Sequence, residues 1–183
     1  MSRPVIITAD STCDLSQELI ERYQIRIIPL TILLGDGSYR DGIDFTPDDM
    51  YLRYHKDGTL PKTAAPSVQD FLDFFGPLIE QGYEIVHLDI SAELSGTFNA
   101  ASIAAQELEG VYTVDSRMLS TGVGLLCIEG AECAARGMAP RSWDSRILRY
   151  RGSPGLSFSA FRHSSCSDLW RRTSQGPSDA STS

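Results

Sequence analysis

The sequence predicts an α/β fold, with a mostly parallel sheet and helices on both of its faces. Apolar runs of strand length alternate along the chain with segments whose apolar residues recur at helical spacing. The apolar runs are almost continuous and the connections are short, as is typical of parallel strands covered on both faces. The length of 183 residues is enough for one such domain with a buried core.

The elements expected in the first third of the chain follow from β-branched runs and helix caps. Residues 5–9 form a short strand, and residues 25–34 form a long apolar strand region. Between them, Ser16 is a suitable N-cap for a helix that runs to about Tyr23. Thr46 begins a second helix, with Pro at its first position and acidic residues in its first turn. This part also contains a turn at 35–37, an extended return over 38–45 and a helix end near Gly58.

The rest of the expected domain alternates helix and strand. After a loop over residues 63–66, a helix that begins at Ser67 carries an apolar stripe, which predicts a face packed on the core. The stripe consists of Phe71, Phe74, Phe75 and Leu78. The later elements are a strand over 85–90, a polar loop over 91–97, a helix over 98–108, a strand over 111–114 and a helix over 119–136.

The charge distribution divides the chain into two regions. Residues 1–139 carry 9 Lys and Arg against 21 Asp and Glu, whereas residues 140–183 carry 7 Arg against 3 Asp. The second region also has 12 Ser, and its hydrophobic residues are isolated. We therefore expect an α/β domain over 1–139 and a Ser/Arg-rich, irregular tail over 140–183. The acidic domain argues against nucleic acid as a partner.

The chain begins with no pattern typical of a signal peptide, and its apolar stretches are too short to span a membrane. The cysteines form no CxxC pair and have no metal-like spacing with the histidines, which predicts free thiols and no metal site. These four cysteines are Cys13, Cys127, Cys133 and Cys166. A cytoplasmic protein that needs no cofactor fits these features.

Three polar loops fall where strands lead into helices, the position at which parallel α/β sheets bind ligands. They span residues 10–12, 62–67 and 91–97. Hydroxyls and free N–H groups at a helix N-terminus can hold a carboxylate or a phosphate, and Gly96 permits close approach. The structural alternatives are that Ser67 and Thr97 are helix caps and that the 10–12 loop is a plain turn.

Catalytic motifs are not supported, and no catalytic residue is predicted. Ser95 lacks the glycine two residues earlier that a nucleophile elbow requires. His87 lies inside an apolar strand, which favours a core histidine over a general base. His55 lies at a helix end, where it complements the helix dipole. The sequence has no Gly-x-Gly-x-x-Gly or Walker-type loop, so nucleotide binding has no motif support.

At these loops the sequence resembles the DegV family of bacterial fatty-acid-binding proteins. The resemblance covers about residues 4–138 and rests on several motifs in the family's order. They are Ile7-Thr8-Ala9-Asp10-Ser11-Thr12-Cys13-Asp14-Leu15, Ile28-Pro29-Leu30, Tyr39-Arg40-Asp41-Gly42, Lys62-Thr63-Ala64-Ala65-Pro66-Ser67, Leu94-Ser95-Gly96-Thr97-Phe98 and Val114-Asp115-Ser116.

The resemblance implies non-covalent binding of a long-chain fatty acid, with the acyl chain in a tunnel between the sheet and its helices. By this resemblance Thr63 and Ser95 hold the carboxylate, and Ser67, Gly96 and Thr97 support them. The family usually has Ser-Gln where this chain has Ala64-Ala65, so the first loop departs from the pattern. Some members present the bound acid to a separate fatty acid kinase subunit. The apolar stripe after Ser67 is a candidate wall for the alkyl chain.

The resemblance fades after about residue 137, where the family continues into a second α/β domain. The Ser/Arg-rich, Lys-free composition of residues 140–183 suggests a frameshift or a truncation. Either would weaken lipid binding. Translation of the coding DNA in its other two frames would test this hypothesis. Two alternatives to a lipid carrier remain at this point. One is a phosphotransferase-related enzyme part, and the other is a truncated remnant without a ligand.

Overall fold

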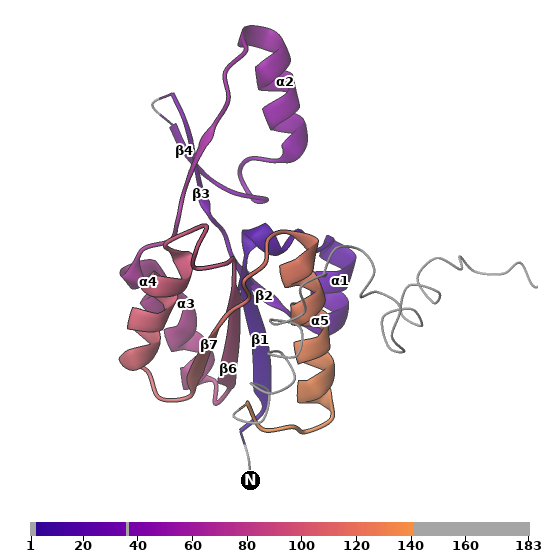
Figure 1. The fold of residues 1–183 in the computed structure, drawn as a ribbon, viewed down its shortest axis with the longest axis vertical. Helices are drawn as coiled ribbons and strands as arrows, with labels where there is room; N and C mark the ends of the chain where they lie inside the picture. The colour runs from indigo at the N-terminus through magenta and orange to yellow at the C-terminus, as the bar shows by residue number, and fades with distance from the viewer. Residues whose placement is uncertain (1–2, 36, 141–183) are drawn as a thin grey trace, which may run out of the picture. The chain divides into compact units, whose positions relative to one another are not determined.

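The computed structural model describes residues 3–35 and 37–140, and these form a body and an arm (Figure 1). The body comprises a four-stranded sheet and four α-helices, and the arm comprises residues 31–64. All but the first residue of the expected tail over 140–183 lies outside the described residues.

The sheet of the body is entirely parallel, with the order β2-β1-β6-β7, which agrees with the mostly parallel sheet that the sequence predicts. Its register pairs Ile7 with Val86 and Leu88 with Val114. The strands are β1 (Val5–Asp10), β2 (Arg26–Ile28), β6 (Glu84–Asp89) and β7 (Val111–Asp115). Because all four strands run the same way, their carboxyl ends meet at one edge, which faces the arm in Figure 1.

Two layers of helices cover the sheet, one on each face (Figure 1). Helices α3 and α4 cover one face, and α1 and α5 cover the other. Their bounds are α1 (Gln17–Tyr23), α3 (Val68–Glu80), α4 (Thr97–Gln106) and α5 (Thr121–Ala135). A short 3-10 turn, η1 (Ser11–Cys13), connects β1 toward α1.

Alternating side chains of β1 and β6 supply a core on each face of the sheet. Ile7 and Val86 pack with residues of α5, whereas Ile6 and Ile85 pack with residues of α3 and α4. The predicted apolar stripe lies in this second core, where Phe71 and Phe75 have no exposed surface. The stripe is therefore a core face, as the sequence predicts. Since both rings are fully buried, they do not line an open channel for an acyl chain.

The arm holds a second, antiparallel sheet that the sequence analysis does not predict. Its order is β4-β3-β5, and one helix lies beside it. The elements are β3 (Thr31–Leu34), β4 (Gly37–Arg40), α2 (Pro47–Asp57) and β5 (Lys62–Ala64). The expected loop over 63–66 is thus wrong at its start, because Thr63 pairs with Ile32 as part of a short strand.

The strand region expected over residues 25–34 is two strands in two different sheets. β2 ends at Ile28 and belongs to the body, whereas β3 begins at Thr31 and belongs to the arm. Pro29 lies between them, and a proline cannot donate a hydrogen bond to a continuing strand ladder. The expectation of one continuous strand is therefore wrong.

Three of the four predicted helix caps are present. Ser16, Thr46 and Ser67 each accept a hydrogen bond from the backbone N–H three residues later. Thr46 and Ser67 each form a capping box, with Asp49 and Asp70 respectively. Within residues 3–35 and 37–140, no helix is long and apolar enough to cross a membrane.

Candidate functional site

Aspartates end three neighbouring strands of the body, and the first of them is a structural tie. Asp10 is fully buried at the end of β1. Its Oδ1 accepts hydrogen bonds from the backbone N–H (2.8 Å) and the hydroxyl of Thr12, and its Oδ2 accepts from the N–H of Ile90 (2.9 Å). Asp10 therefore caps the turn after β1 and fixes the first residue beyond β6, which agrees with the turn alternative.

The loop over residues 91–97 is fixed on its other side by β7. The backbone N–H of Ala92 donates to Asp115 Oδ1 (3.1 Å) at the end of β7. Within the loop, the N–H of Ser95 donates to the carbonyl of Ser91 (3.1 Å). The loop is thus held between the ends of β1 and β7, with Ser95 near its end.

A buried polar network lies under this edge, within the sheet. His87 Nδ1 is 2.7 Å from Thr8 Oγ1, and His87 Nε2 is 2.8 Å from Asp89 Oδ1. The rings of Phe71 and Phe75 contact the imidazole edge-on, with centroid distances of 5.2 and 5.1 Å. His87 has no exposed surface. It is a core histidine, as the sequence predicts, and no substrate has access to it.

Asp89 is the least satisfied member of this network. Its Oδ2 is buried and has no hydrogen-bond partner among the described residues. Burial raises the pKa of Asp89, and the nearby carboxylates of Asp10 and Asp115 raise it further, while His87 lowers it. The network therefore favours the protonated form of Asp89 over a range in which an exposed aspartate is ionised.

The predicted residues Ser95, Gly96 and Thr97 form one unit at the start of α4. Ser95 Oγ accepts the backbone N–H of Thr97 (3.2 Å) and lies 2.7 Å from Thr97 Oγ1. Gly96 is the N-cap and makes no side-chain cap hydrogen bond, so the prediction that Thr97 is the cap is wrong. Thr97 is instead the buried first residue of the helix. A Cβ added at Gly96 would meet nothing within 4 Å, so the space beside it is open.

The predicted residues of the other loop, Thr63 and Ser67, lie on different elements. Ser67 caps α3, and its hydroxyl is bonded to Asp70 (2.7 Å), which confirms the structural alternative for this residue. Thr63 is exposed on β5 of the arm. Ser95 lies on the body, so the placement of Thr63 relative to Ser95 depends on how the arm is attached.

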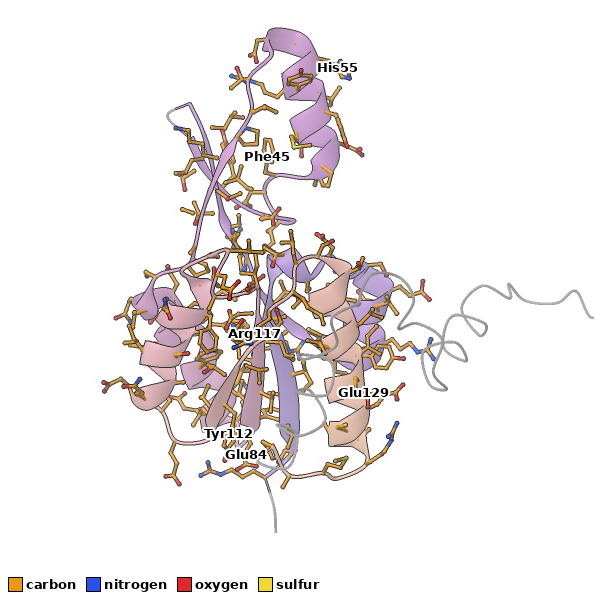
Figure 2. All side chains as sticks on the ribbon, in the orientation of Figure 1. Phe45, His55, Glu84, Tyr112, Arg117 and Glu129 are labelled. Atoms are coloured by element: carbon orange, nitrogen blue, oxygen red, sulfur yellow. The ribbon has the colours of Figure 1, made fainter. Side chains whose placement is uncertain are left out.

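A hollow of about 340 Å³ lies within the arm, between α2 and the arm's sheet. It is lined by Leu34, Tyr39, Asp44, Phe45, Asp49, Leu52, Arg53 and Lys56. None of the predicted site residues lines it, and Asp44 and Asp49 already bind Arg40 and Thr46. Figure 2 shows Phe45 in the arm, far from Glu84 and Tyr112 at the opposite end of the body. We assign no ligand to this hollow.

Sequence reasoning missed two contacts at the carboxyl edge. The first joins Ser11 to Asp41 of the arm (2.7 Å), and the second joins the Ser120 hydroxyl to Asp14 Oδ2 (2.5 Å). Ser120 also has φ 59° and ψ −133°, a conformation that residues other than glycine rarely adopt. Both contacts join residues that are distant in sequence. For the contact between Ser11 and Asp41, a signal was present, because both residues lie in family motifs.

The body is an α/β domain with a parallel sheet between two helical layers and hydroxyl-bearing loops at its carboxyl edge, the edge at which open α/β sheets bind ligands. A family model with the description "Uncharacterised protein, DegV family" matches residues 4–153. The chain belongs to the DegV family, as the motifs predict.

Relatives and solved structures agree with this assignment. A DegV domain-containing protein of Clostridium perfringens is 37% identical over 153 residues, which cover 82% of this chain and 54% of the relative. One from Staphylococcus aureus is 37% identical over 125 residues, or 68% of this chain and 44% of the relative. The chain spans about half the length of the curated relatives it matches.

Several solved structures share the fold at more than 30% identity, among them two that are described as fatty-acid-binding proteins from named bacteria. One is a DegV family protein from Thermus thermophilus whose fatty acid binding is described, with a TM-score of 0.75 and 33% identity. The other is a stearic acid-binding protein from Eubacterium ventriosum, with a TM-score of 0.70 and 31% identity. Both alignments cover 81% of this chain, and they cover 53% and 52% of the two solved chains respectively.

Proposed function

We propose that this protein binds a long-chain fatty acid non-covalently, with Thr63 and Ser95 as donors to the carboxylate. The observation that carries the proposal is the likeness to the fatty-acid-binding structures from Thermus thermophilus and Eubacterium ventriosum. The two hydroxyls that the family resemblance implies are those of Thr63, on an exposed strand of the arm, and of Ser95, in the loop before α4.

The geometry of the loop before α4 supports Ser95 as a donor. Ser95 Oγ has two acceptor positions, and the N–H of Thr97 occupies one of them. When the Thr97 hydroxyl occupies the other, the proton of Ser95 is left for a ligand. Gly96 leaves space beside it, and the positive end of the α4 dipole favours an anion. Thr97 and Gly96 thus support Ser95, whereas Ser67 fixes the start of α3.

The proposed role is carriage without catalysis by this chain. A carrier that presents its acid to a separate fatty acid kinase subunit needs only to hold the carboxylate at an accessible edge, and Ser95 is half-exposed there. We place this role in the cytoplasm, because Cys13, Cys127 and Cys133 are free thiols. Long-chain acids bind largely through their alkyl chains, at about 0.8 kcal/mol for each buried methylene.

Native mass spectrometry of the purified protein tests the proposal, with stearic acid as the added probe. We expect a bound acid in the wild type and an affinity about 10- to 100-fold weaker in Thr63→Ala or Ser95→Ala, because each loses a donor to a charged acceptor. Ser38→Ala removes an exposed hydroxyl from β4 of the same arm and is the matched control. Well-folded wild type that binds no fatty acid would contradict the proposal.

A further inference from the structure

The hydroxyl of Ser11 on the body forms hydrogen bonds at the base of the arm. This hydroxyl donates to Asp41 Oδ2 (2.7 Å) and accepts from the backbone N–H of Leu30 (3.0 Å). The N–H of Asp41 in turn donates to the carbonyl of Leu30 (2.9 Å). Three hydrogen bonds therefore connect Ser11, Leu30 and Asp41 in a closed ring.

The ring lies at the base of the arm's hairpin. Leu30 immediately precedes β3, and Asp41 immediately follows β4. β3 also carries β5, and Thr63 on β5 pairs with Ile32, two residues beyond Leu30. Ser11 is therefore connected to Thr63 through its hydrogen bond with Leu30 and the pairing of β3 with β5.

The residue before Ser11 fixes the other half of the proposed site. Asp10 accepts from the N–H of Ile90, the residue that leads into the loop of Ser95. Both of its carboxylate oxygens are occupied, so its position relative to β6 is well defined. Two consecutive residues of one turn, Asp10 and Ser11, therefore hold the elements that carry Ser95 and Thr63.

We propose that the Ser11–Asp41 hydrogen bond is a positioning contact for the bound carboxylate. It sets the placement of Thr63 on the arm relative to Ser95 on the body, and neither Ser11 nor Asp41 touches the ligand. The inference rests on the proposed function. Two donors on different elements bind one carboxylate more strongly when their separation is fixed before binding.

The test is a double-mutant cycle on stearic acid affinity. We expect Ser11→Ala and Asp41→Ala each to weaken binding about tenfold, and the double variant to be no weaker than either, because all three lose the same contact. Asp41→Asn keeps an acceptor oxygen for the Ser11 hydroxyl, so it restores the affinity that Asp41→Ala loses. The melting temperature of the body is expected to change little in these variants.

Arg40→Ala is the matched control. Arg40 is the neighbour of Asp41 in sequence. The substitution removes the 2.7 Å contact between Arg40 Nε and Asp44 Oδ2, which lies entirely within the arm. We expect this variant to bind stearic acid as the wild type does. Hydrogen exchange at the Leu30 amide reports directly whether the ring has opened in each variant.

Each failure has its own signature. If Thr63→Ala and Ser95→Ala lose affinity while Ser11→Ala and Asp41→Ala do not, the positioning inference is wrong and the proposed function stands. Additive losses in the cycle, or no rescue by Asp41→Asn, would also overturn the inference. If the wild type binds no stearic acid, the proposed function and the inference are both overturned.

Discussion

The body and the arm have comparable helix caps but very different interiors. β1 and β6 at the centre of the body each bury all but their first residue, whereas α2 of the arm buries none of its 11 residues. Figure 2 shows His55, near the end of α2, on the outer surface of the arm. The body is therefore stabilised largely by buried apolar area. The arm buries fewer apolar side chains, among them Ile32 and Phe45, and depends more on caps, ion pairs and the contact with Ser11.

Truncation of one large side chain in each region gives the largest expected contrast. Phe75 is fully buried in the body, whereas Leu52 on α2 is 70% exposed. We expect Phe75→Ala to lower the free energy of unfolding by about 3–5 kcal/mol, and Leu52→Ala to lower it by less than about 0.5 kcal/mol. Chemical denaturation measures both, and similar losses would show that α2 packs as the core does.

The two regions also contain acids whose pKa values shift in opposite directions. Burial raises the pKa of Asp89 in the body, so its contribution to stability is full below about pH 4 and is lost as the pH rises through the raised pKa. Relative to Asp89→Asn, we expect the wild type's free energy of unfolding to fall above about pH 4, by up to about 1.4 kcal/mol per pH unit.

Asp49 of the arm provides the contrast. Hydrogen bonds from Thr46 lower its pKa, so its contribution is present at neutral pH and is lost as the pH falls through the lowered pKa. Denaturation series over the acidic range, made with Asp89→Asn and Asp49→Asn, measure both dependences. Slopes of the same sign for the two variants would refute the comparison.

The two capping boxes allow the same change to be made in each region. Ser67→Ala removes the cap of α3, and we expect it to lower the free energy of global unfolding by about 1 kcal/mol. Thr46→Ala removes the equivalent cap of α2, and we expect faster amide exchange within α2 with little change in global unfolding. Denaturation and hydrogen exchange distinguish the two results, and a global loss in Thr46→Ala would mean that the arm and body unfold together.

Thiol reactivity has the smallest expected consequence for stability. Burial raises the pKa of Cys13 in the body to about 11, so little thiolate is present at pH 8. We expect its alkylation in the folded protein to be more than about 100-fold slower than in the unfolded chain. Ser38→Cys places a thiol on exposed β4 of the arm as the control, and mass spectrometry resolves the two sites. Fast labelling of Cys13 would show that the body opens readily.

The sequence predicts local features of this fold well and long-range features poorly. The caps at Ser16, Thr46 and Ser67 depend on residues within one helical turn, and all three are present. The second sheet is not predicted because its strands are short and β5 pairs with β3 over a long sequence separation, for example Ile32 with Thr63. The break at Pro29 was readable in principle, since a proline interrupts a ladder.

The candidate site shows the same division. Ser95, Gly96 and Thr97 are neighbours in sequence and lie together as expected, but Thr97 begins α4 instead of ending the loop, and the N-cap is Gly96. The contact between Ser11 and Asp41 could not be derived from spacing, because it depends on where the arm is placed on the body. The roles of Thr63 and Ser95 in carboxylate binding stay a prediction.

The position of β1 at the centre of the sheet determines the order in which a growing chain can fold. Thr8 of β1 and His87 of β6 are hydrogen-bonded partners 79 positions apart, so β1 stays unpaired on that side until residues 84–89 have been synthesised. The arm needs only residues 31–64 for all of its pairing. The strand pairing of the arm can therefore form during synthesis before β1 pairs with β6.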